Sequence, residues 1–304
     1  MLKVYTNTTD FKIIEPTVVA IGKFDGDHIG HQKIFEIMRN IKAEKGYKSA
    51  VFTFLDMSDK QISPSQEKHL LFEAEEIDYC IEYPFNDETK AITAKDFLEK
   101  ILIGKLNMKH IVAGSDCAFG HNREGNKDFL LEYSHVNDYY VTIINKVKTG
   151  ETDISSTYIR NLLDSGRVEE VSELLGHPYR ITGKVEEGNH IGSDILGFPT
   201  ANIYPDSDKY IPASGVYAVR INIQDGHDYY GMTNIGINPS IRQDDLNHCK
   251  RIETYIFDFN EDIYGKMISI SFIQYIRPEV TFNDIKELKE QLINDEFQIR
   301  SLFK

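Results

Sequence analysis

The chain has 304 residues and carries 34 Lys and Arg against 48 Asp and Glu, a formal net charge of −14 with histidine neutral. Apolar residues make up 41% of the sequence, with 17 Phe and 17 Tyr, so disorder and a coiled coil are both disfavoured. The acidic balance argues against a general nucleic-acid binder, which needs a positive field, although a local nest of backbone N–H groups can still hold a nucleotide. At about 100–200 residues per domain, the length predicts two domains or one large one.

Cysteine usage and hydropathy predict a soluble protein of a reducing, cytoplasmic compartment. Cys80, Cys117 and Cys249 are widely spaced and form no CxxC pair, so neither a disulfide framework nor a structural zinc site is indicated. The N-terminus has no basic-then-apolar signal pattern, and the sequence has no run of about 18 apolar residues. We therefore expect no transmembrane helix and no membrane partner.

The first half of the chain alternates strand-like and helix-like stretches. Short apolar or β-branched runs predict the strands, and apolar residues at helical spacing predict the helices. The predicted strands are 17–24, 49–54, 77–83, 110–113 and 140–145, and the predicted helices are 31–45 and 94–103. This alternation predicts a parallel sheet that is covered on both faces.

The pattern changes in the second half. Two short helices are predicted at 156–165 and 168–175, with Gly166 as a C-cap between them. Closely spaced strand-like runs with frequent turn signals then predict an antiparallel barrel. These runs are 179–185, 215–223, 228–236, 251–259 and 267–276, and one amphipathic helix at 283–303 follows them. We expect two domains, 1–176 and 177–304.

A glycine-rich turn, GKFDGDHIGH at residues 22–31, joins the first predicted strand to the first helix. Its glycines let backbone approach a ligand closely, and the helix N-terminus behind them favours an anion. His28 and His31 are three residues apart, so both can face one phosphate and donate hydrogen bonds as charge develops during transfer. A pair of surface histidines on a capped helix, or an incomplete metal site, is the alternative.

Two further segments carry polar groups that suit a nucleotide. In ISSTYIR at residues 154–160, Ser156 and Thr157 can cap a helix and bond phosphate oxygens, and Arg160 can neutralise a triphosphate. An ordinary N-cap and a surface cation are the alternatives. The glycine-rich segment GSDCAFG at residues 114–120 is, by itself, compatible with a simple turn.

In combination, these segments resemble the GxFDGxHxGH, ISSTxIR and GxDFxFG motifs of the prokaryotic FAD synthetases, which are HxGH nucleotidyltransferases. The resemblance implies a Rossmann-like α/β nucleotidyltransferase domain that joins AMP from ATP to FMN and releases pyrophosphate. It implies catalytic roles for His28, His31 and Arg160. The implied nucleotide-binding residues are Gly22, Phe24, Asp25, Gly26, Gly30, Ser156 and Thr157, and the implied flavin-binding residues are Asp116, Phe119 and Gly120.

The first domain also departs from that family. The usual Pro-His-Pro after Phe54 is absent, and Asp56 and Asp59 stand in that neighbourhood. Cys117 replaces the usual aromatic residue of the third motif, and Asp27 adds a negative charge beside the phosphate loop, where it would weaken anion binding.

The segment LGFPTANI at residues 196–203 resembles the GFPTANI motif of riboflavin kinases. Thr200 offers a hydroxyl and Asn202 an amide oxygen, both suited to Mg²⁺ that bridges ATP phosphates. A strand-end turn is the alternative. The resemblance implies an antiparallel β-barrel kinase domain with a C-terminal helix. It assigns Gly188, Gly192, Thr200 and Asn202 to nucleotide binding, Thr200 and Asn202 to the metal, and Gly197, Phe198 and Pro199 to flavin binding.

Phosphorylation of a primary alcohol needs an acceptor for the hydroxyl proton. Glu253 lies in the E-x-x-x-F-D-F segment of the family, and strand alternation predicts that it shares a face with Tyr255, Phe257 and Phe259. A carboxylate on an aromatic face is costly unless it has a purpose or a partner, so Glu253 is the candidate base. An edge position open to water, or a salt bridge with an arginine, is the alternative.

The matches cover essentially the whole chain and predict a bifunctional riboflavin kinase/FMN adenylyltransferase that uses riboflavin, FMN and ATP with Mg²⁺. Ser193 and Asn238 stand where arginine is common, which predicts weaker binding of ATP or flavin. The alternatives are a monofunctional riboflavin kinase with an impaired adenylyltransferase domain and a flavin-binding regulator without turnover. The oligomeric state stays open.

Overall fold

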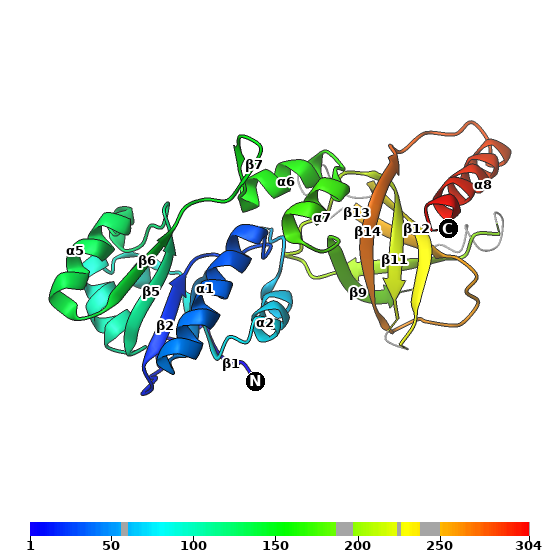
Figure 1. Ribbon diagram of the computed structural model, residues 1–304. Helices are drawn as coiled ribbons and strands as arrows, with labels where there is room; N and C mark the ends of the chain where they lie inside the picture. The colour runs from blue at the N-terminus through cyan, green and yellow to red at the C-terminus, as the bar shows by residue number, and fades with distance from the viewer. Residues whose placement is uncertain (56–59, 187–196, 224–225, 238–249, 304) are drawn as a thin grey trace. The chain divides into compact units, whose positions relative to one another are not determined.

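The computed structural model describes residues 1–55, 60–186, 197–223, 226–237 and 250–303 (Figure 1). The chain divides into two compact units, Met1–Ser156 and Thr157–Lys304. This division falls after the first residue of the short helix α6 (Ser156–Asp164), so the rest of α6 and the short helix α7 (Val168–Leu175) are in the second unit, where α7 packs against a strand. The functional boundary after residue 176 stays a prediction.

The first unit is built on a six-stranded sheet, and all of its paired strands are parallel. The strand order is β1 (Lys3–Thr6), β4 (Tyr79–Pro84), β3 (Lys48–Leu55), β2 (Thr17–Ile21), β5 (Met108–Gly114) and β6 (Tyr140–Ile144). The predicted parallel sheet is confirmed. The edge strand β1 was not predicted, because four residues of half-buried and exposed character give too short a pattern.

Helices connect these strands, and a small hairpin precedes α6. They are α1 (Ile29–Lys45), α2 (Ser65–Ala74), α3 (Asp87–Lys90), α4 (Ala94–Asp96), the π-helix η1 (Phe97–Ile103), the 3₁₀ turn η2 (His121–Arg123) and α5 (Lys127–Asn137), with the hairpin β7 (Lys148–Thr149) and β8 (Thr152–Asp153). The predicted helix 94–103 is present, but it widens to π geometry from Phe97 onward. Helix α2 was not predicted. It buries only Lys68 and Phe72, and one apolar residue among two buried positions gives no recognisable helical spacing of apolar residues.

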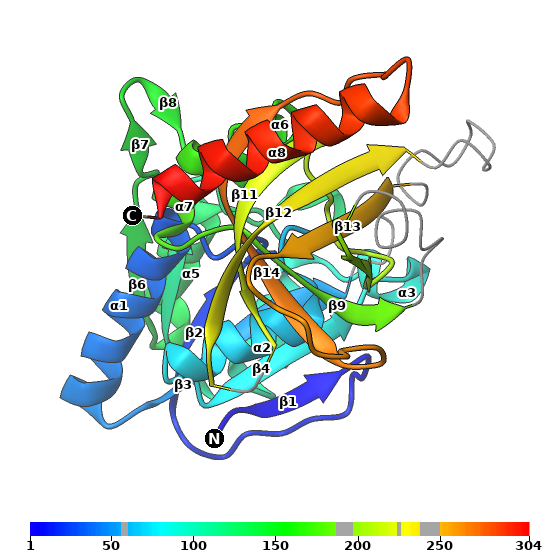
Figure 2. The same ribbon diagram turned by 90° about the vertical axis from the view of Figure 1, so that its right-hand side faces the viewer.

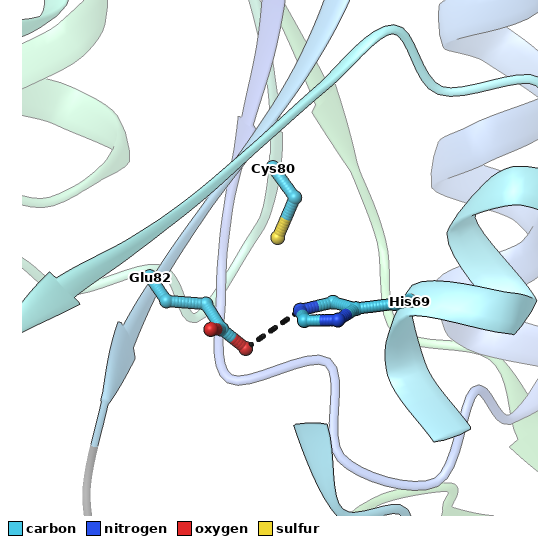
Figure 3. Close-up of side chains that lie close together, drawn as sticks. All are labelled: His69, Cys80 and Glu82. Carbon is cyan, nitrogen blue, oxygen red and sulfur yellow. Dashed lines mark hydrogen bonds and ion pairs between the residues drawn. The ribbon is translucent and has the colours of Figure 1, made fainter. Parts of the chain in front are cut away.

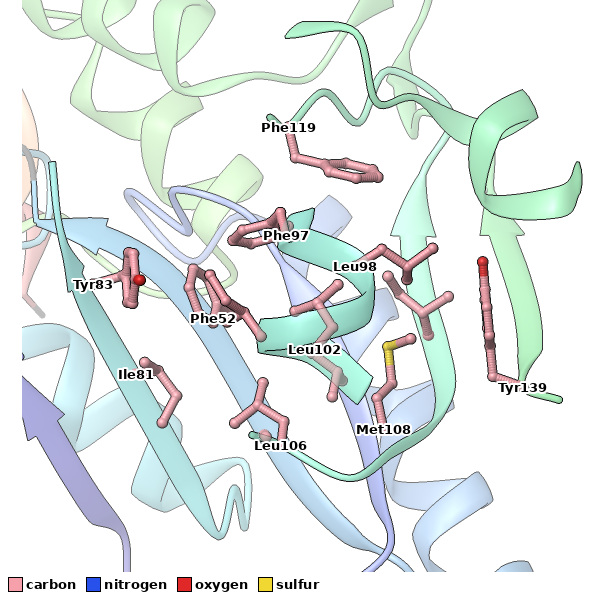
Figure 4. Packing of buried hydrophobic residues seen from close by; sticks show 14 of the residues in the cluster. Phe52, Ile81, Tyr83, Phe97, Leu98, Leu102, Leu106, Met108, Phe119 and Tyr139 are labelled. Carbon is pink, nitrogen blue, oxygen red and sulfur yellow. The ribbon is translucent and has the colours of Figure 1, made fainter. Parts of the chain in front are cut away.

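Apolar side chains cover both faces of the sheet, as predicted. On one face the π-helix presses Phe97 against Phe52 of β3, with ring centroids 5.1 Å apart in an edge-to-face arrangement (Figure 4). On the other face α1 contributes Phe35 and Met38 to a separate cluster with Val51. Because Phe52 and Val51 are neighbours on one strand, each face receives every second side chain.

The second unit is a closed barrel of six strands, and every neighbouring pair is antiparallel, which confirms the predicted barrel. Around the barrel the strands are β10 (Thr200–Pro205), β13 (Lys250–Ile256), β12 (Asp228–Ile237), β11 (Gly215–Asn222), β14 (Met267–Arg277) and β9 (Arg180–Glu186). The GFPTANI segment supplies β10, a sixth strand that the five predicted runs lacked. Buried Thr233 and Thr254 share a 2.7 Å hydrogen bond between their hydroxyls inside the barrel.

Helix α8 (Ile285–Leu302) lies against the outside of this barrel (Figure 2). Its Ile299 joins an apolar cluster with Val216 and Met232 of the strands beneath. Near this contact, the Arg277 guanidinium donates to both carboxylate oxygens of Asp295 at 2.7–3.0 Å. Asp295 is 1% exposed, so this ion pair ties the helix to the end of β14.

We expect Asp295→Ala to destabilise the barrel unit by about 3 kcal/mol, because it leaves the Arg277 charge without its buried partner. The midpoint of urea unfolding, followed by circular dichroism, measures the effect. Glu290→Ala on the same helix removes only an exposed pair with Lys286 and serves as the control. Equal stability of the two variants would contradict the proposed anchor.

Candidate active sites

The loop after β2 turns through left-handed backbone at three points. Phe24 has φ 46°, Gly26 has φ 92° and Asp27 has φ 31°. A Cβ on Gly26 would lie 2.9 Å from the side chain of Ile62, so this position needs glycine both for its φ and for space. The loop therefore packs directly against the segment that leads into α2.

Asp25 ties this loop to two other parts of the first unit. Its buried carboxylate accepts a hydrogen bond from the Ser63 backbone N–H at 3.0 Å. Its carbonyl oxygen accepts the hydroxyl proton of Ser156 at 2.7 Å. Ser156 thus uses its proton to brace the loop, and Asp25 takes part through both its carboxylate and its carbonyl oxygen.

The two predicted histidines lie together at the start of α1. His28 is the N-cap residue, and its ring stacks on that of His31 with centroids 3.7 Å apart and an angle of 18°. A Cβ on Gly30 would lie 3.0 Å from the His28 ring, so glycine there leaves room for the stack. Within the described residues, the Nδ1 atoms of both histidines are buried without a hydrogen-bond partner.

Burial controls the charge of both rings. Desolvation lowers the pKa of His28 to about 4. The pKa of His31 falls well below its ordinary value, through burial first and then through the charges of His28 and Lys68. Both imidazoles are therefore neutral near pH 7, and each can donate one N–H while its other nitrogen accepts. Phe24, whose ring lies 5.2 Å from that of His31, is buried in the core, so it can approach a nucleotide only through its backbone.

Asp27 stands beside the histidines and is 4% exposed. Burial raises its pKa to about 7, and the charge of Glu75 adds to the effect. The side chain therefore carries only part of a negative charge at neutral pH, so its repulsion of an anion is smaller than the sequence predicted.

The other predicted adenylyltransferase residues on α6 belong to the second unit. Thr157 is exposed, and the Arg160 guanidinium lies 5.8 Å from the centre of the Tyr210 ring. The Tyr210 hydroxyl donates to the Asp164 carboxylate at 2.8 Å, which fixes the ring under Arg160.

The predicted flavin loop follows β5. Asp116 is exposed and pairs with Lys146 at 3.1 Å, a cation that none of the sequence motifs contains. Phe119 is 3% exposed and packs against Phe97 and Phe129, so its ring anchors the loop in the core. A Cβ on Gly120 would lie 2.5 Å from backbone of Ala94, and its φ of 73° also requires glycine.

The pairing of β13 with its two neighbouring strands brings the predicted kinase residues of the barrel together. Glu253 of β13 pairs with Asn202 of β10 on one side and with Asn234 of β12 on the other. One step along the same face, Tyr255 pairs with Thr200. Paired residues of antiparallel strands point to the same face, so Thr200 and Asn202 lie on the face that carries Glu253. The register of β12 and β13 adds Asn234 to this face.

Glu253 has a partner and is partly exposed. Arg251 donates to its carboxylate at 3.1 Å, and both side chains are about a third exposed. The strand ends at Ile256, and Asp258 turns with φ 56°, so the predicted alternation to Phe259 was too long. Within the strand, Glu253 shares its face with Arg251 and Tyr255.

The predicted flavin segment begins at Gly197, which has φ 78° and where an added Cβ would meet none of the described residues within 4 Å. Phe198 is buried and contacts the Tyr255 ring edge-to-face at 5.0 Å. The aromatic pair fixes the segment next to the face that carries Glu253. Pro199 follows immediately and leads into β10.

Several predicted positions lie outside the described residues. They are Gly188 and Gly192 of the phosphate-covering loop, the replacements Ser193 and Asn238, and residues 56–59 after β3. No helix among the described residues is long and apolar enough to cross a membrane.

Comparisons with known proteins agree on both halves of the chain. Residues 10–158 match the FAD synthetase family model, and residues 175–303 match the riboflavin kinase model. Curated bifunctional riboflavin kinase/FMN adenylyltransferases from Listeria monocytogenes and Bacillus subtilis are 35% and 36% identical, over 94% and 92% of this chain and 92% and 90% of theirs. A crystal structure described as a macrolide-efflux protein from Streptococcus pneumoniae has 30% identity and a TM-score of 0.87, with 98% of each chain covered.

Asp27→Asn tests the buried carboxyl beside the histidines. Between about pH 4 and 7 the native state keeps a proton that the unfolded chain has released, so stability falls as the pH rises. Asparagine does not titrate, and we expect the stability of the variant relative to the parent protein to rise by about 3 kcal/mol from pH 5 to pH 8. Urea unfolding at both pH values measures it, with the exposed Asp10→Asn as control. If the difference in unfolding free energy between the variant and the parent protein is the same at both pH values, the pKa of Asp27 is not raised.

Proposed function

The chain belongs to the bifunctional riboflavin kinase/FMN adenylyltransferase family, and from that premise we propose which of its residues carry each reaction. The enzyme phosphorylates riboflavin to FMN and adenylylates FMN to FAD, and ATP is the co-substrate of both steps. We assign the first reaction to residues 177–304 and the second to residues 1–176. Because both steps consume ATP, we place the enzyme in the cytoplasm.

Glu253 is proposed as the base of the kinase reaction, and its position in the register carries this assignment. It accepts the proton of the riboflavin 5′-hydroxyl while that oxygen bonds to the γ-phosphorus of ATP and the bond to the β–γ bridging oxygen breaks, which releases ADP. Arg251 donates a hydrogen bond to this carboxylate at 3.1 Å and limits the orientations open to it. Gly197, Phe198 and Pro199 are proposed to contact the flavin, and Gly188 and Gly192 the nucleotide.

Thr200 and Asn202 are proposed to hold Mg²⁺. Their hydroxyl and amide oxygens are hard donors on the face that carries Glu253, which fits the donor set that Mg²⁺ prefers. When bound, the ion neutralises charge on the ATP phosphates. The two side chains themselves orient the nucleotide next to the base.

The adenylyltransferase reaction is proposed to use the stacked histidines. A phosphate oxygen of FMN bonds to the α-phosphorus of ATP, and pyrophosphate leaves. The N–H groups of His28 and His31 donate to the phosphate oxygens where charge develops, in a buried setting that strengthens each bond. Both rings are neutral before ATP binds. A bound anion raises the pKa values of the rings, because its negative charge favours their protonated form, and so draws a proton to the site.

The remaining proposed roles follow the motifs. Gly22, Phe24, Asp25, Gly26 and Gly30 shape the phosphate loop, Ser156 braces it, and Thr157 and Arg160 contribute to nucleotide binding. Asp116 and Gly120 are proposed to contact the flavin, and Phe119 supports them from the core.

Product chromatography tests the two activities together. Incubation of the protein with riboflavin, ATP and Mg²⁺, and in parallel with FMN in place of riboflavin, should yield FAD in both reactions. FMN without FAD would leave a kinase with an impaired adenylyltransferase domain, and FAD from FMN alone would leave only a synthetase. No product in either reaction would favour a flavin-binding regulator.

Glu253→Gln should lower the rate of FMN formation by about 10²–10⁴-fold, because glutamine cannot accept the hydroxyl proton. The rate of FAD formation from FMN should stay unchanged, because that reaction is assigned to the other unit, and an unchanged urea-unfolding midpoint shows that the barrel is folded. Glu261→Gln, at an exposed position beyond the strand, is the matched control. A variant that forms FMN at the parent rate would exclude Glu253 as the base.

His31→Asn should reduce FAD formation from FMN by about 10²–10³-fold, since one buried donor to the phosphates is lost. His28→Asn should act in the same direction, and both variants should keep the riboflavin kinase rate. His135→Asn on the exposed face of α5 is the control. Unchanged FAD formation in both variants would remove the histidines from the proposed mechanism.

A further inference from the structure

Three metal-ligating side chains meet on the first unit at a place that neither proposed reaction uses. They are His69 on α2 and Cys80 and Glu82 on β4, and one ligand atom of each lies within 4.8 Å of the others. Figure 3 shows the three side chains converging between the strand and the helix. Cys80 and Glu82 are two residues apart on one strand, so alternation points both toward α2.

We propose that His69, Cys80 and Glu82 form a binding site for one thiophilic divalent cation, with Zn²⁺ as the best fit. The donor set of one sulfur, one nitrogen and one oxygen suits Zn²⁺ and excludes Mg²⁺, which requires oxygen ligands. Three protein ligands leave a fourth tetrahedral position open for water.

The present geometry is close to what such an ion requires. The His69 Nε2 and Glu82 Oε1 atoms are 3.0 Å apart, near the roughly 3.4 Å edge of a tetrahedron with Zn–N and Zn–O bonds of about 2.1 Å. The Cys80 sulfur lies within 4.8 Å of a ligand atom of each of the other two residues. His69 is 27% exposed, so an ion can enter from solvent on that side.

The charges of the site balance on binding. The Cys80 thiol gives its proton to solvent, His69 binds as the neutral imidazole, and Glu82 binds as the carboxylate. The two negative ligands then offset the 2+ charge, so a neutral group is buried rather than a net charge. Burial raises the pKa of the Cys80 thiol, so the cation must displace a firmly held proton, and the buried Lys68, next to His69 on α2, repels the cation as well. We therefore expect weaker binding than at a four-ligand site.

A neighbouring residue already orients one ligand. The Thr6 hydroxyl of β1 donates to Glu82 Oε2 at 2.8 Å, and Oε1 faces His69, where the metal would replace the hydrogen bond between the two side chains. Partners of this kind position metal ligands, and their loss weakens metal affinity by about 10–100-fold. The site would join α2 to β4 and so stabilise the segment that supports the phosphate loop.

Cobalt spectroscopy tests this proposal. Titration of metal-free full-length protein with Co²⁺ should produce thiolate-to-cobalt absorption in the near ultraviolet, which Zn²⁺ displaces and excess Mg²⁺ does not. Cys80→Ser should abolish the absorption, while Cys117→Ser, at the half-buried cysteine after β5, should keep it.

Two further variants keep the test decisive if Cys80→Ser fails to fold. His69→Gln at a partly exposed helical position and the isosteric Thr6→Val should each remain folded by circular dichroism and lower Co²⁺ affinity by at least about tenfold. Absence of the absorption in the parent protein, its loss in Cys117→Ser, or unchanged affinity in both His69→Gln and Thr6→Val would overturn the site. The rates of FMN and FAD formation are measured separately and do not enter this decision.

Discussion

Asp25 holds the phosphate loop in place, and the rest of the proposed adenylyltransferase site depends on that restraint. A loop with left-handed backbone at Phe24, Gly26 and Asp27 is costly unless its surroundings fix it. The hydrogen bonds of Asp25 to Ser63 and Ser156 fix it from two directions. Helix α1 then starts at a defined point, and its first turn carries the stacked histidine pair.

Burial gives this site a different electrostatic character from a cluster of cations. The neutral histidines and the partly protonated Asp27 carry little charge of their own at the start of α1. The backbone N–H groups at the start of α1 and the ring N–H groups supply the attraction for an anion instead. A chain with a net charge of −14 can therefore contain a phosphate site, because short-range donors matter more there than the distant field.

Local sequence patterns predicted the parts of the fold that depend on neighbouring residues. In the β2–loop–α1 unit and in most of the barrel strands, the hydrophobic periodicity is complete within one short segment. These elements are present in the structure. Strand β1 and helix α2 were not predicted because their stability comes from distant partners rather than from a period of their own. The grouping of His69 and Cys80 was equally hidden, since cysteine spacing alone indicated no metal site.

The barrel site also shows that sequence patterns do not reveal which distant residues come together. The motifs identified Thr200, Asn202 and Glu253, but Glu253 is distant in sequence from the other two, and only the register of β10 and β13 brings them to one face. Both alternatives that the sequence left open for Glu253 describe real features, since it is partly exposed and paired with an arginine. Neither feature argues against a base. A general base must be accessible to substrate and oriented toward it, and partial exposure and a hydrogen bond from a neighbouring arginine are compatible with both conditions.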